Sequence, residues 1–140
     1  MPSDRPPQPT PAELAILRVL WRRGRSTVRD VLDELNAGEG TRSGGDAKPT
    51  GYTTVLKLMQ IMTDKGLVRR DESQRTHVYE ASGRHGEEQT QRRLVKDLLD
   101  RAFGGSAQKL ILQALSAKKA TPQEIAEIRS LLDEMERGKP

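Results

Sequence analysis

The stretch GYTTVLKLMQIMTDKGLVRR, residues 51–70, decides the fold, because it predicts one helix with two chemically different faces. With about 100° of rotation per residue, four apolar side chains share one face: Val55, Leu58, Met59 and Met62. The opposite face carries Thr53, Lys57, Gln60 and Asp64. We therefore expect a helix over 52–65 that packs on its own domain with the first face and leaves the second free for a partner.

Two shorter helices are expected before this one. Thr10-Pro11-Ala12-Glu13 is a capping box, so the first helix begins here, and Gly24 marks its end. Ser26 and Thr27 offer a second cap. The residues that follow are apolar at i, i+3, i+4 and i+7, which predicts a short amphipathic helix that ends near Asn36.

A helix stop at Gly66 is followed by two strand candidates, 67–71 and 76–81, which we expect to form a hairpin. Three helices and then a hairpin are the order of a winged helix-turn-helix. We expect a DNA-binding domain over 10–83. It is preceded by a flexible arm over 1–9, and 38–50 form an inserted loop that contacts phosphate or simply lies in solvent.

The remaining residues, 84–140, predict only helices, so the fold class is mainly α with a small β-hairpin. Their apolar faces are too extensive for so short a segment to bury alone. We therefore expect a three-helix lobe that dimerises. The residues expected in that interface are Leu94, Leu98, Leu99, Phe103, Leu110, Ile111, Ile128, Leu132 and Met135.

Composition narrows the classes of function. The 140 residues carry a net charge of +4, which permits a nucleic-acid partner. The chain has no cysteine and only two histidines, and it lacks the motifs of a hydrolase or a zinc protease. We expect no enzyme activity, no cofactor and no metal. The absence of a signal sequence or a long apolar run predicts a cytoplasmic protein.

The free face of helix 52–65 has the chemistry for DNA. A helix fits the major groove, where lysine suits guanine acceptors and threonine suits the thymine methyl group. Tyr52 places its hydroxyl on a phosphate or packs on the hairpin, and the hairpin arginines reach the DNA backbone or minor groove. The residues expected to contact DNA are Tyr52, Thr53, Thr54, Lys57, Gln60, Arg69 and Arg75.

Five arginines occur together without an intervening acid: Arg18, Arg22, Arg23, Arg25 and Arg29. They are candidate phosphate contacts, or else the solvated end of a helix. The leading hypothesis is a dimeric repressor that binds double-stranded DNA. The alternative is a winged-helix adaptor for another protein, without sequence-specific DNA binding; an acidic or apolar free face would favour it.

The chain resembles the penicillinase-repressor family of BlaI/MecI type over about residues 10–136. The stretches that carry the resemblance, in family order, are TPAELAILRVLW, YTTVLKLMQIMTDKGLVRR, RTHVYEA, DRAFGGSAQKLILQAL and PQEIAEIRSLLDEM. The resemblance implies a homodimeric repressor that binds an inverted repeat of TACA-type half-sites. It also implies a membrane-bound sensor protease as a partner, which triggers cleavage of the repressor in its carboxy-terminal lobe and the release of DNA.

The scissile Asn-Phe pair of the family's beta-lactam-responsive members falls on Gln113-Ala114, by matching KLILQALSA. This pair marks the possible cleavage position, although the bond is not preserved.

Overall fold

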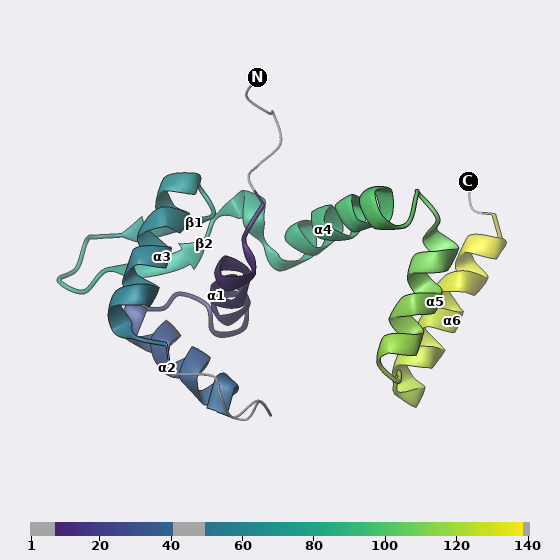
Figure 1. Ribbon diagram of the computed structural model, residues 1–140, viewed down its shortest axis with the longest axis horizontal. Coiled ribbons are helices and arrows are strands. Elements are labelled where there is room, and N and C mark those ends of the chain that lie inside the picture. Colours follow the sequence, from purple (N-terminus) through teal and green to yellow (C-terminus); the bar gives the residue numbers. More distant parts are fainter. Residues whose placement is uncertain (1–7, 41–49, 139–140) are drawn as a thin grey trace, which may run out of the picture. The chain divides into compact units, whose positions relative to one another are not determined.

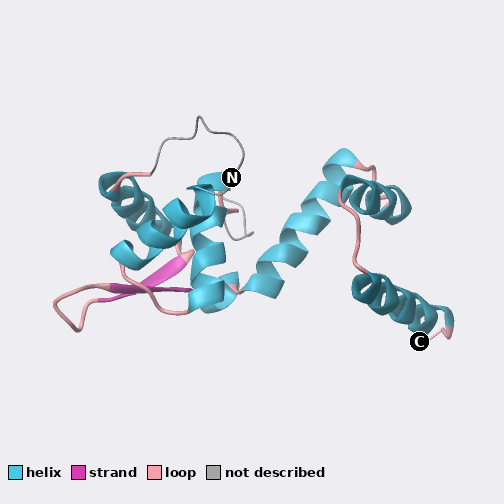
Figure 2. Cartoon of the chain, turned by 90° about the horizontal axis from the view of Figure 1, so that it is seen from below, coloured by secondary structure: helices cyan, strands magenta, loops and turns pink. Residues whose placement is uncertain are grey.

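The computed structural model describes residues 8–40 and 50–138, and these are mainly helical with one small hairpin (Figures 1 and 2). In chain order the elements are α1 (Pro11–Arg23), α2 (Val28–Gly40), α3 (Tyr52–Lys65), β1 (Val68–Asp71), β2 (Val78–Ala81), the 3₁₀ helix η1 (Gly83–His85), α4 (Glu87–Ala102), α5 (Ala107–Ala117) and α6 (Pro122–Glu136). The expected fold class, a winged helix-turn-helix followed by three helices, is confirmed.

Two expected boundaries are wrong. α2 continues to Gly40 instead of ending near Asn36, because a helix that is already formed gains one hydrogen bond for each residue it adds. β2 begins at Val78, because Asp71 pairs with Val78 and the residues between them form the loop of the hairpin. Residues 1–7 of the expected arm over 1–9 and residues 41–49 of the expected loop over 38–50 lie outside the described residues.

The first three helices and the hairpin enclose one core (Figure 1). α1 contributes Ile16 and Leu17, and α3 contributes the expected Val55, Met59 and Met62, all without solvent exposure. Leu58 is half-buried against the same core. Burial of this apolar area is the main force that holds α3 on its domain, because the free energy of the folded state falls in proportion to the apolar area removed from water.

The hairpin is attached to the helices by backbone hydrogen bonds. Ser26 and Tyr79 exchange two N–H···O bonds of 3.0 and 2.8 Å, so the segment before α2 forms a bridge to β2. The end of α3 is equally defined. Gly66 has a positive φ of 82°, and Leu67 N–H donates to Met62 C=O at 2.9 Å, the pattern of a Schellman cap.

The chain divides into two compact units, Met1–Leu94 and Val95–Pro140. The first half of α4 belongs to the first unit, where Trp21 Nε1 donates to His85 C=O at 3.0 Å and Thr90 is buried. In the second unit neither α5 nor α6 has a buried residue. This division lies inside α4, whereas the expected domain boundary lies after residue 83. That boundary stays a prediction.

Candidate nucleic-acid interface

α3 presents the two faces that its sequence predicts. Every residue predicted to read DNA from this helix is exposed: Tyr52, Thr53, Thr54, Lys57 and Gln60. No acidic residue occurs in the first turn of the helix, and Asp64 lies near its other end. Ile61 is also exposed, at 39%, and the sequence reading did not include it. The result is a polar surface with one cation and one apolar side chain.

A hollow lies where the start of α3 approaches the start of α2 and the hairpin loop. Its polar lining comes from the three segments, and we call it the basic groove: Thr27, Arg29, Tyr52, Arg75, Thr76 and His77. The Arg29 guanidinium carbon lies 5.4 Å from the centre of the Tyr52 ring, within the range of a cation–π contact. Tyr52 therefore supports an arginine, a role that neither sequence alternative included.

Most of the arginine cluster is neutralised within the protein. Arg22 and Arg23 reach Glu34 at 3.0 and 3.5 Å, and Arg25 pairs with Asp71. Among the described side chains, residues 8–37 and 50–138, neither Arg18 nor Arg29 has a carboxylate within 4 Å. Arg18 lines a different hollow, beside Trp21, so Arg29 is the member of the cluster that lies in the basic groove and is free to meet an anion.

The arginines of the hairpin differ in the same way. Arg69 pairs with Glu80 across the two strands at 3.1 Å, and Arg70 pairs with Glu72 at 2.6 Å. Arg75 is exposed in the loop, and no carboxylate of the described residues pairs with it. Arg75 is thus the better placed of the two predicted hairpin contacts, because Arg69 would have to leave Glu80 to bind a phosphate.

Asp71 fixes the base of the hairpin loop. Its carboxylate accepts a hydrogen bond from Ser73 N–H at 2.9 Å and pairs with Arg25. The Ser73 hydrogen bonds first, and then Arg25, lower the pKa of Asp71 from 3.8 to about 2. A charged Asp71 therefore links the turn before α2 to the hairpin at neutral pH.

The second unit exposes many apolar side chains. Of the residues predicted to dimerise, Leu98, Ile111, Leu132 and Met135 are exposed, Met135 by 65%, and Leu99, Phe103, Leu110 and Ile128 are half-buried. The predicted set does not include five further exposed apolar residues of this unit: Val95, Leu112, Leu115, Ile125 and Leu131. Leu94 differs from the set, because it lines a hollow with Leu14 and Trp21 inside the first unit.

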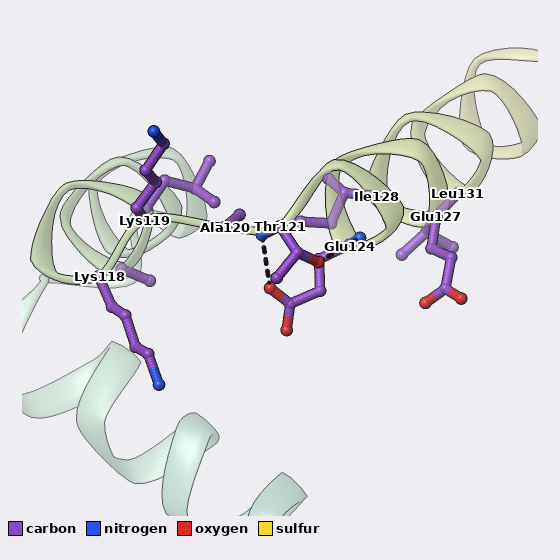
Figure 3. Close-up of a pocket in the computed structure, with 10 residues that line it drawn as sticks. Lys118, Lys119, Ala120, Thr121, Glu124, Glu127, Ile128 and Leu131 are labelled. Carbon is purple, nitrogen blue, oxygen red and sulfur yellow. Dashed lines mark hydrogen bonds between the residues drawn. The ribbon is translucent and has the colours of Figure 1, made fainter.

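α5 and α6 enclose the hollow shown in Figure 3. Ala114, Ile128 and Leu131 give it an apolar lining, while Lys118 and Lys119 come from the turn between the helices. α6 begins at its edge with a capping box like that of α1, in which Thr121 N–H donates to Glu124 Oε1 at 2.9 Å. The possible cleavage position, Gln113-Ala114, is exposed within α5, so a protease would require local unwinding of that helix.

The described residues offer little for other kinds of site. No group of three or more histidine, cysteine or acidic side chains among them is placed to hold a metal. Within the same residues, no helix is both long enough and apolar enough to cross a membrane.

The fold and the exposed α3 surface define the class of the winged helix-turn-helix proteins. The model of the family described as penicillinase repressor matches residues 9–134. The chain belongs to the penicillinase-repressor family, whose members are transcriptional repressors and not enzymes. No curated protein sequence matches the chain.

Titration of Asp71 tests the geometry of the hairpin. We expect an NMR-monitored midpoint of about 2 for its carboxyl group, well below the ordinary 3.8. Because the folded pKa is the lower one, Asp71 stabilises the folded state above pH 3.8, and this contribution is lost as the pH falls towards 2. Arg25→Gln should raise the midpoint, whereas Arg22→Gln should not. A wild-type midpoint close to 3.8 would contradict the contacts of Asp71.

Proposed function

We propose that the protein is a dimeric, sequence-specific repressor that binds an inverted-repeat operator and reads each half-site with α3. The observation that carries the proposal is the division of α3. Val55, Met59 and Met62 are fully buried, while Thr53, Thr54, Lys57 and Gln60 are exposed beside a groove that contains arginines. Such a helix can enter a major groove without loss of its own packing.

Base contacts and phosphate contacts are assigned to different residues. Lys57 is proposed to donate to guanine acceptors or to phosphate, and Thr53 and Thr54 to contact thymine methyl groups or base edges. In the basic groove, Arg29 and Arg75 are proposed to bind the phosphate backbone, which fixes the register of α3 but carries no sequence information.

The second unit is proposed to join two copies of the chain. Its exposed leucines, isoleucines and methionines need a partner, because contiguous apolar surfaces of this kind mark interaction sites in soluble proteins. A dimer places two α3 helices on half-sites about one helical turn apart, which adds their binding energies. Release of DNA in the cytoplasm by a membrane-bound sensor protease remains part of the proposal, with a bond other than the family's Asn-Phe.

The alternative function is a winged-helix adaptor for another protein. The exposed Ile61 is the feature of α3 that favours it. The absence of acidic side chains from the first turn and the unpaired Arg29 argue for DNA. The two functions differ in how affinity for the partner depends on salt. Contacts with DNA phosphates release counterions, so affinity falls steeply with salt, whereas contacts with another protein do not release counterions in this way.

Lys57→Ala tests the reading face. We expect operator affinity to fall about tenfold, with little change in melting temperature, because Lys57 is exposed and makes no ion pair in the described residues. The measurement is a mobility-shift titration on a duplex selected from a random pool by the wild-type protein. Lys96→Ala, which removes a lysine from α4, is the control and should bind as the wild type does. Equal binding by all three proteins would remove Lys57 from the interface.

Arg29→Gln tests the basic groove against a matched change. Arg29 is stacked on Tyr52, whereas Arg22 is paired with Glu34, so only the first is expected to meet phosphate. Arg29→Gln should weaken binding to every duplex alike and reduce the slope of log affinity against log salt by about one. Arg22→Gln should leave the slope unchanged. A loss confined to one DNA sequence would assign Arg29 to base reading instead.

Leu132→Asp tests the proposed interface of the second unit. A charge at this exposed apolar position of α6 should yield monomers in sedimentation velocity and lower operator affinity about a hundredfold, because the gain from two linked sites is lost. Ser130→Asp adds the same charge at a polar exposed position of α6 and should remain dimeric. A dimeric Leu132→Asp protein would place the interface elsewhere.

A further inference from the structure

Glu13 is a charged residue in an unusual place. It lies in the first turn of α1 and is only 3% exposed. Carboxylates are almost never fully buried unless they are paired, because burial removes the water that stabilises the charge. Its part in the capping box of α1 could be performed at the surface, as Glu124 does at the start of α6. The burial of Glu13 therefore requires a second explanation.

The second partner of Glu13 is Lys65, in the last turn of α3. Lys65 Nζ donates to Glu13 Oε1 at 2.7 Å, and the same oxygen accepts from Thr10 N–H at 3.0 Å. One carboxylate oxygen thus joins the amino-terminal cap of α1 to the carboxy-terminal end of α3, 52 residues along the chain. The Lys65 side chain is itself only 29% exposed. The bond is short and charge-assisted, which makes it directional.

The protonation state of Glu13 is consistent with this contact. Burial acts to raise the pKa of the Glu13 carboxyl group. The hydrogen bonds from Lys65 and Thr10, together with the positive charge of Lys65, outweigh burial, so the pKa is lowered. Glu13 is therefore ionised at neutral pH, and removal of Lys65 would leave a buried charge without its partner.

The other contacts that hold α3 are apolar or lie at its amino-terminal end. Val55, Met59 and Met62 hold the helix by burial, which is non-directional and tolerates small rotations. Tyr52 contacts Arg29 at the first turn. Among the side chains that the structure describes, those of residues 8–37 and 50–138, Glu13–Lys65 is the one ion pair that joins α3 to another element.

We propose that Glu13 is a positioning residue for DNA recognition, which acts through Lys65 to fix the rotation and tilt of α3 in the major groove. The inference rests on the proposed function of α3. A small rotation of the helix would move Lys57 relative to the base edges. Contacts with the DNA phosphates tolerate small shifts in position and would be little affected. The pair is thus expected to support specificity more than general affinity for DNA.

The test compares two duplexes of equal length and composition: one selected from a random pool by the wild-type protein, and one with its sequence scrambled. Glu13→Gln retains an oxygen for the cap of α1 but removes the charge, Lys65→Met removes the donor, and Lys65→Arg retains it. Lys96→Met is a matched control in α4, where Lys96 pairs with Asp100 at the surface. Affinities are read by fluorescence anisotropy, and melting by circular dichroism.

We expect Glu13→Gln and Lys65→Met each to weaken binding to the selected duplex about three- to tenfold, with binding to the scrambled duplex unchanged. The double variant should lose no more than either single one, since both remove the same contact. Lys65→Arg should bind nearly as the wild type does. Because the double variant leaves no unpaired buried charge, it keeps the test valid if either single variant folds poorly.

Four results would overturn the inference. An equal loss on both duplexes would make Lys65 a phosphate contact. A lower melting temperature with an unchanged preference for the selected duplex would make the pair purely structural. Unchanged preference in Glu13→Gln and Lys65→Met, together with a loss in Lys57→Ala, would remove the positioning role but leave the proposed function intact. Failure of the wild-type protein to prefer any duplex would overturn both.

Discussion

The structure depends on one constraint: α3 must bury one face completely and still present the other to a partner. Val55, Met59 and Met62 meet Ile16 and Leu17 in the core, and Thr53, Lys57 and Gln60 lie outside it. α1 and the hairpin are positioned by this burial, since the loss of core packing would release the helix from both. The exposed residues are consequently held by contacts that a partner does not disturb.

Pairing with acids determines which basic residues remain available. Arg22, Arg23, Arg25 and Arg69 each have a carboxylate partner, whereas Arg29 and Arg75 in the basic groove and Lys57 on α3 have none among the described side chains. The carboxylates that remove arginines from the surface also connect elements: Asp71 joins the hairpin to the turn before α2, and Glu13 joins α1 to α3. The same charges therefore shape the basic groove and stabilise the frame that carries it.

The sequence predicted the parts that depend on local periodicity and capping. Both capping boxes, the bounds of α3 and the burial of its apolar face follow from residues three or four positions apart. The sequence could not predict that Tyr52 supports Arg29 or that Lys65 reaches Glu13, because these contacts join residues far apart in the chain. The end of α2 was missed because glycine lowers helix propensity without forbidding a helix.

α4 begins in the first unit and ends in the second. Its start is held by the Trp21–His85 hydrogen bond and by buried Thr90, so the first unit fixes where the helix begins. The second unit buries no residue of α5 or α6 within one chain. Under the proposed function, a second chain covers these helices and association stabilises them. If two chains pair there, operator binding and assembly stabilise each other by mass action, and any event that opens the second unit weakens the hold of α3 on DNA without a change in the reading face.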